Sequence, residues 1–168
     1  ENGFDHMQVA LAVGVQQMVA VRSEAAGVMF TLDMESGFRD VVTINSIYGL
    51  GENIVQGKVS PDEFTVFKKT GTILRKKIGA KRLKMVPGED STTMDVDVPE
   101  EDQHRYSITE EQVKTLAEWG MAIEEMYGKA MDMEGALDED YGTLYIVQAG
   151  PETVRSQKDA TSFEEDRR

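Results

Sequence analysis

Most of the chain consists of short runs in which β-branched and other apolar residues alternate with polar ones, a pattern typical of strands. It predicts strands at about residues 13–20, 25–31, 40–46, 64–68 and 73–78, with a turn at 22–24 after the first. Thr70-Gly71 separates the last two strands, which predicts a β-hairpin. Residues 87–105 are polar and acidic and contain two prolines, so we expect a loop there.

One segment has the period of a helix rather than that of a strand. Apolar residues recur at helical spacing from Val113 to Met126, which predicts a helix over 109–127 that ends at Gly128. Ser107 or Thr109 can cap this helix, and Ser107 and Glu110 have the spacing of a capping box. Two further strands are predicted at 130–136 and 143–149, joined by an acidic turn. This order predicts an α+β fold with a largely antiparallel sheet and one long helix.

Composition narrows the functional classes. The 168 residues include 40% hydrophobic and 29% charged residues, which is ordinary for a soluble globular domain. The formal net charge is −13, which argues against nucleic acid and against an anionic membrane surface as partners. The sequence contains no cysteine, which excludes disulfides and thiolate chemistry, and no secretory signal is recognisable, so a cytoplasmic location is expected.

Two strands near the C-terminus carry candidate chemistry. Asp132 and Glu134 are two residues apart in a predicted strand, so both carboxylates project from one side, opposite Met131 and Met133. Such a pair suits Mg²⁺ shared with phosphate oxygens, although a solvated strand face would show the same spacing. Gln148 lies in the neighbouring apolar strand, where its amide either has structural partners or faces a cleft.

Two other segments stand out by composition. Residues 48–57, called the glycine segment below, hold three glycines in ten positions, which a plain strand or helix would not tolerate. They allow a ligand to approach the backbone, or simply make a tight connection. Eight of the 18 basic residues fall within 68–84, a cluster that could meet phosphates but rather predicts a solvated hairpin face or a surface for an acidic neighbour. His6 and His104 are isolated and are expected at the surface.

Three runs of sequence carry a family resemblance. Residues 4–19, 23–37 and above all 48–64 (Tyr-Gly-Leu-Gly-Glu-Asn-Ile-Val-Gln-Gly-Lys-Val-Ser-Pro-Asp-Glu-Phe) closely resemble the nucleotide-binding region of the phosphoenolpyruvate synthases. The wider family is the ATP-binding domain that these enzymes share with pyruvate phosphate dikinases and rifampicin phosphotransferases. The resemblance covers about residues 2–156 and leaves 157–168 as a charged tail, expected to fray like all of the chain from Glu152 onward. It implies the C-terminal lobe of an ATP-grasp fold, in which ATP lies between two lobes.

The resemblance also implies roles for particular residues. Glu52, Asn53, Ile54 and Val55 match the segment that lines adenine and ribose, with Glu52 accepting from the ribose hydroxyls. Gln16 matches the glutamine on the strand under the nucleotide.

The phosphate end of the site is implied in the same way. Asp132 and Glu134 match the paired carboxylates that hold Mg²⁺ on the ATP phosphates, and Gln148 matches a strand glutamine at the same end. The implied reaction converts ATP, pyruvate and water to AMP, phosphoenolpyruvate and phosphate through a phosphohistidine carrier.

Three positions depart from the family pattern. Gly150 stands where the family has an arginine that clamps phosphate, Gly135 where a tryptophan is usual, and Ala130 where a proline is usual. The first ATP-grasp lobe, the phosphohistidine domain and the pyruvate-binding barrel are not recognisable in the sequence, so they are implied partners, and the chain alone is expected to be inactive. A non-catalytic interaction module of the same fold, and a segment of a related dikinase or rifampicin phosphotransferase, remain as alternatives.

Overall fold

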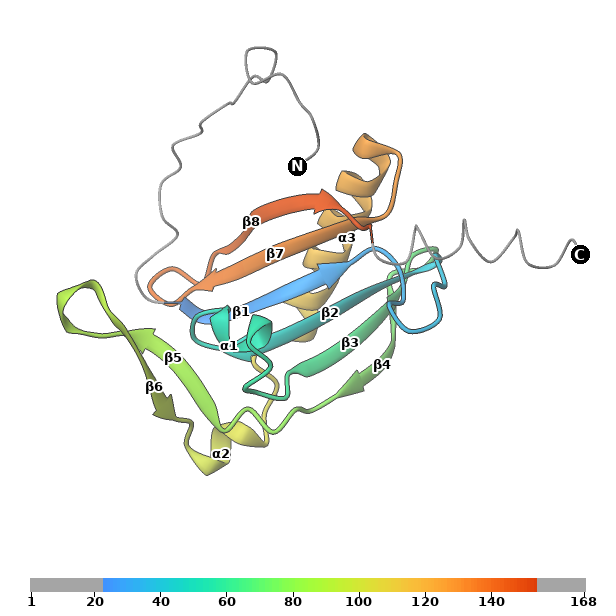
Figure 1. Ribbon diagram of the computed structural model, residues 1–168. Helices are drawn as coiled ribbons and strands as arrows, with labels where there is room; N and C mark the ends of the chain where they lie inside the picture. The colour runs from blue at the N-terminus through green and yellow to red at the C-terminus, as the bar shows by residue number, and fades with distance from the viewer. Residues whose placement is uncertain (1–22, 154–168) are drawn as a thin grey trace, which may run out of the picture.

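A computed structural model describes residues 23–153 of the protein. Six strands form one antiparallel sheet in the order β4-β3-β2-β1-β7-β8 (Figure 1). Their bounds are Ser23–Phe30 for β1, Val41–Tyr48 for β2, Asp62–Phe67 for β3, Thr72–Lys77 for β4, Met131–Asp138 for β7 and Leu144–Pro151 for β8. The expected antiparallel sheet, including the β3–β4 hairpin, is therefore confirmed. The strand expected at 13–20 lies outside the described residues.

One long helix, α3 (Glu110–Tyr127), covers one face of the sheet, and the core lies between the two (Figure 1). Of the residues that the helical period picked out, Met126 in the last turn is exposed, whereas Val113, Leu116, Ala117 and Gly120 are buried. Every second residue of the strands faces them, so the sheet contributes the other half of the core, which includes Met29, Ile44, Phe64, Val66, Met131 and Met133. The opposite face of the sheet is called the open face below.

The segment 87–105 is not the loop that its polarity predicted. Strands β5 (Leu83–Pro87) and β6 (Thr93–Asp97) form a separate two-stranded hairpin, with a short 3₁₀ turn at Glu89–Ser91 between them. A short helix, α2 (Glu100–Gln103), follows. Most side chains of β6 are exposed, so the run lacks the alternation of apolar residues that marks a strand, although its backbone pairs fully with β5.

Three local predictions need correction. Ser23 and Glu24 belong to β1 rather than to a turn. The capping box of α3 is formed by Thr109 and Gln112 rather than by Ser107 and Glu110, so Thr109 is the one of the two expected caps that the helix uses. The Thr109 side chain accepts from the backbone amide of Gln112, the Gln112 side chain accepts from the backbone amide of Thr109, and Ser107 has other partners. Glu152 does not fray: it is buried, and its amide donates to Ala130 O at 2.9 Å.

The two outer edges of the sheet differ in charge. Strand β4 carries Arg75, Lys76 and Lys77, the kind of side chains that discourage pairing with another chain. Strand β8, with the sequence Leu-Tyr-Ile-Val-Gln-Ala-Gly-Pro, has no charged side chain over its eight residues. Among residues 23–153, no helix is long and apolar enough to cross a membrane.

Candidate functional site

The acid pair, Asp132 and Glu134, lies on the open face of the sheet. Along β7 the residues alternate, with Met131 and Met133 fully buried toward α3 and the two carboxylates on the other side. Asp132 is exposed and Glu134 is half-buried. The predicted projection of both carboxylates from one face is thus what the strand shows, and the apolar side of the strand anchors it to the core.

Gln148 reaches the same face through a β-bulge. Glu134 pairs with Gln148, but the next residue, Gly135, pairs with Ile146, so Val147 is an extra residue in β8. In a regular strand Ile146 and Gln148 would face the same side. The bulge lets Ile146 pack against the core while Gln148, which is exposed, lies opposite Glu134.

The surroundings of Asp132 favour a cation. Partial burial raises the pKa of Asp132, and the negative charges of Glu134 and then Glu152 raise it further. Glu152 was not among the predicted site residues, because the sequence places it beyond the strand in a charged tail. Within the described part of the chain no cluster of three or more acidic or histidine side chains could hold a metal ion by itself. A divalent cation bound between the two carboxylates would therefore take further oxygen ligands from elsewhere.

The glycine segment leaves β2 at Tyr48 and turns onto the open face. Gly49 has φ +74°, and a Cβ there would lie 2.4 Å from Met85 O, so only glycine allows this approach to β5. Leu50 donates its amide to Met85 O at 2.9 Å. A Cβ added at Gly51 would lie 3.5 Å from the Cβ of Ala26, which is on the open face of β1. The segment then forms the four-residue helix α1 (Glu52–Val55), which the glycine content did not predict (Figure 1).

The four predicted nucleotide-lining residues have different environments. Glu52 is exposed, Ile54 is half-buried and Val55 is 76% exposed, so three of them are accessible. Asn53 is fully buried, and its Nδ2 donates to Asp95 Oδ1 on β6 at 2.9 Å. Its Oδ1 has no hydrogen-bond partner within residues 23–153. The Asn53 side chain thus ties α1 to the hairpin, a contact that sequence spacing could not reveal.

Asp95 is the charged partner in this contact. The hydrogen bond from Asn53, followed by the nearby charge of Lys58, holds the pKa of Asp95 below its ordinary value. Lys58 Nζ lies 3.4 Å from Asp95 Oδ2. An ionised carboxylate only accepts hydrogen bonds, so Asp95 fixes the amide of Asn53 with its nitrogen toward the hairpin.

Strand register relates the glycine segment to the acid pair. Ala26, under Gly51, pairs with Ala136, while Val28 pairs with Glu134 and Phe30 with Asp132. At about 3.4 Å per residue, the two carboxylates lie roughly 7 and 14 Å along the strands from Ala26, on the same face. The structure therefore brings Glu52–Val55, the acid pair and Gln148 to one surface. Gln16 lies outside the described residues.

The same register identifies open-face residues that the sequence did not single out. Asn45 on β2 pairs with Val28, in line with Glu134 and Gln148, and Thr43 pairs with Phe30, in line with Asp132. Strands β2, β7 and β8 thus contribute polar side chains to this face, whereas β1 contributes the apolar residues Val28 and Phe30. The signal for Asn45 and Thr43 was the alternation of β2, which becomes informative only when the pairing of the strands is known.

The basic residues of 68–84 do not form the single solvated face that was expected. Lys81 is fully buried. Lys76 and Lys77 are neighbours in β4 and therefore lie on opposite faces of the sheet. Lys76 points toward α3 and pairs with Glu110 at 2.5 Å, whereas Lys77 pairs with Glu63 at 2.9 Å. Strand β4 is four strands away from β7, so these residues are remote from the acid pair. His104 is exposed, as expected.

The two glycines that replace family residues differ in the space around them. Nothing lies within 4 Å of a Cβ added at Gly150, which pairs with Asp132. A Cβ at Gly135 would lie 3.2 Å from Tyr145 O, so a larger side chain there requires the strand to move. An arginine at 150 would thus be accommodated without rearrangement, whereas a tryptophan at 135 would not.

The helix-backed antiparallel sheet, with a glycine-bearing turn and an acid pair on its open face, defines a lobe of the ATP-grasp type. Comparison with known proteins gives the family. Residues 1–168 match the family described as "Pyruvate phosphate dikinase, AMP/ATP-binding domain", and the chain belongs to it.

Relatives with this domain are similar over nearly all of the chain. A phosphoenolpyruvate synthase of Neisseria meningitidis is 52% identical over 166 residues, covering 94% of this chain and 21% of that protein. Those of Pseudomonas aeruginosa and Aquifex aeolicus are 51% and 49% identical, covering 96% and 93% of this chain and 22% and 20% of the respective proteins. The chain thus spans about a fifth of the length of these relatives.

Proposed function

We propose that the chain forms part of the ATP-binding site of a phosphoenolpyruvate synthase, which converts ATP, pyruvate and water to AMP, phosphoenolpyruvate and phosphate. The observation that carries the proposal is the common surface: α1 and the acid pair lie on one face of the sheet, along the same two strands. A nucleotide lying along β1 would have its base near Glu52–Val55 and its phosphates near Asp132 and Glu134. The names of the relatives favour the synthase over the other members of the family.

The donor set fits Mg²⁺. Burial, followed by the charges of Glu134 and Glu152, disfavours Asp132 as an anion, so the two carboxylates on one strand face gain from a cation between them. Within residues 23–153 no third acidic or histidine side chain completes an all-protein site. In this proposal Asp132 and Glu134 hold the ion, which neutralises charge on the phosphates when it is bound. Gln148, opposite Glu134, orients a phosphate oxygen or a metal-bound water through its amide.

The remaining parts of the reaction belong to partners outside residues 1–168. The proposal includes a first ATP-grasp lobe that completes the nucleotide site, a domain with the phosphorylated histidine and a pyruvate-binding barrel, all in the cytoplasm. Gln16 would lie under the nucleotide. The chain alone would bind ATP weakly and turn over nothing, because phosphoryl transfer depends on positioning by groups on both sides of the phosphates.

Calorimetric titration with Mg-ATP tests the proposal. The double variant Asp132→Asn/Glu134→Gln should lose the magnesium-dependent part of ATP binding. Glu139→Gln, which removes an exposed carboxylate from the turn after β7, is the matched control and should bind as the unmodified chain does. If the double variant bound Mg-ATP as tightly as the control, the acid pair would have no metal role. Formation of phosphoenolpyruvate by the 168-residue chain alone would contradict the need for partners.

A further inference from the structure

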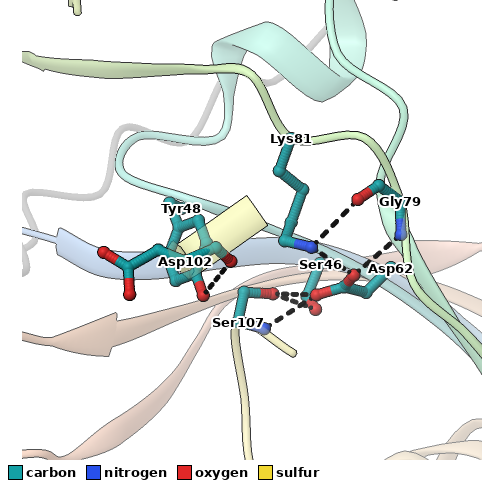
Figure 2. A network of polar contacts seen from close by, with 7 residues as sticks. All are labelled: Ser46, Tyr48, Asp62, Gly79, Lys81, Asp102 and Ser107. Carbon is teal, nitrogen blue, oxygen red and sulfur yellow. Dashed lines mark hydrogen bonds and ion pairs between the residues drawn. The ribbon is translucent and has the colours of Figure 1, made fainter. Parts of the chain in front are cut away.

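A buried network of polar side chains lies where β2 ends and the glycine segment begins (Figure 2). At its centre Asp62, the first residue of β3, and Lys81, just before β5, form an ion pair in which both side chains are fully buried. Lys81 Nζ donates to Asp62 Oδ1 at 2.6 Å and to Gly79 O at 3.1 Å. A buried ion pair is a poor source of stability by itself, because desolvation opposes the attraction. The burial of this pair therefore needs a reason other than stability.

Two of the four donors to the anion of the pair come from Ser107, just before α3. The other oxygen of Asp62, Oδ2, accepts from the amide of Ser107 at 2.7 Å and from its hydroxyl at 2.8 Å. The hydroxyl proton of Ser107 is used in the bond to Asp62. The hydroxyl of Ser46 therefore donates to Ser107 Oγ, and the two oxygens are 2.7 Å apart. Gly79 N also donates to Asp62 Oδ1, at 2.9 Å. Asp62 would thus keep three donors if Lys81 were neutral.

The cation of the pair faces the glycine segment instead. Lys81 Nζ lies 5.7 Å from the centre of the Tyr48 ring, a cation–π contact at the last residue of β2. Tyr48 is fixed at its other end by a hydrogen bond from its hydroxyl to Asp102 O at 3.0 Å. Burial, with the negative charges of Asp102 and then Asp62, raises the pKa of Tyr48 to about 12, so the ring remains neutral.

Lys81 also lies next to the strand on which the glycine segment rests. It comes two residues before Leu83, where β5 starts, and Met85 of that strand accepts the amide of Leu50. The bonds of Lys81 to Asp62 and Gly79 thus tie the chain just before β5 to the start of β3, beside the Tyr48 ring at the start of the segment.

We propose that Lys81 is a positioning residue for the glycine segment, holding Gly49–Gly51 in the course that brings α1 onto the open face. The relevance of this role to ATP rests on the proposed function. The role itself is a property of the unliganded protein and can be measured without nucleotide.

Amide hydrogen exchange of the 168-residue chain tests the role. Lys81→Met removes the charge at similar length, Ser107→Ala weakens the same network from the α3 side, and Arg82→Met removes an exposed neighbouring charge. We expect the Leu50 amide to exchange at least ~10-fold faster in Lys81→Met, with β7 and β8 unchanged, and to stay protected in the other two variants. Lys81→Gln, which keeps a donor, replaces Lys81→Met if the latter does not fold.

Mg-ATP affinity provides the second readout. Lys81→Met should weaken binding at least ~10-fold, equivalent to about 1.4 kcal/mol, and Arg82→Met should leave it unchanged. Two results would contradict the proposal and leave Lys81 with a structural role only. One is protection of the Leu50 amide in Lys81→Met equal to that in the unmodified chain. The other is a loss of Leu50 protection in Ser107→Ala as large as that in Lys81→Met. If the unmodified chain bound no Mg-ATP, the proposed function would fail while hydrogen exchange still decided the role of Lys81.

Discussion

Replacing Gly49 by alanine should destabilise the protein far more than the loss of a flexible residue accounts for. Two costs add at this position. An alanine at φ +74° adopts the left-handed region, which costs roughly 1–2 kcal/mol. Its Cβ would also lie 2.4 Å from Met85 O, a backbone atom that cannot rotate away, and overpacking of this kind costs typically 1–3 kcal/mol. The expected loss in the free energy of unfolding is therefore about 2–5 kcal/mol.

Gly71 provides the matched control for Gly49. It has φ +67°, and nothing lies within 4 Å of an added Cβ, so Gly71→Ala meets only the first cost, roughly 1–2 kcal/mol. Urea unfolding followed by the fluorescence of Trp119 and by circular dichroism gives both values. If Gly49→Ala cost no more than Gly71→Ala, the glycine segment would not be held against β5, and its path over the open face would need another explanation.

Three further predictions concern the site and the core. Gly150→Arg should change stability by less than ~0.5 kcal/mol, because the added side chain meets open space beside Asp132, and should strengthen Mg-ATP binding in calorimetry. The unfolded chain loses the Tyr48 proton near pH 10 and the folded chain only near pH 12. The free energy of unfolding should therefore fall as pH rises between these values, and Tyr48→Phe should flatten that fall in unfolding curves measured at alkaline pH. Phe64→Ala, in the core under α3, should lower the free energy of unfolding by about 3–5 kcal/mol, whereas truncating the exposed Phe38 should cost under ~1 kcal/mol.

The elements whose residues alternate with the period of their own structure could be predicted from the sequence. Strands β1 to β3 and β7 and helix α3 lie near the expected positions, because each has one apolar side that is buried in the core. Strands β4 and β8 also lie near theirs, although only Ile73 of β4 and Leu144 and Ile146 of β8 pack partly buried against the core. The acid pair followed from the same rule, since Asp132 and Glu134 alternate with two buried methionines. The β5–β6 hairpin was missed because β6 has little apolar surface to bury.

The contacts between elements could not be predicted from single segments. The bulge at Val147 reverses the direction of Gln148 relative to Ile146, and nothing in the run Tyr-Ile-Val-Gln indicates an extra residue. The ion pair between Asp62 and Lys81 joins residues 19 apart, and Lys81 was expected on a solvated basic face. Asn53 resembled a ligand-facing residue by family pattern, but its amide binds Asp95. Such contacts depend on the register and packing of distant segments.

The difference between the two sheet edges has a consequence for handling the protein. Within residues 23–153 the β8 edge presents eight uncharged residues whose outer amides and carbonyls have no strand beside them, which favours intermolecular strand pairing. The overall charge of −13 opposes such pairing through long-range repulsion. Salt weakens that repulsion, since the screening length shrinks from about 30 Å at 0.01 M to about 10 Å at 0.1 M. Association through this edge should therefore be weaker in dilute buffers than in saline ones, the reverse of common purification practice.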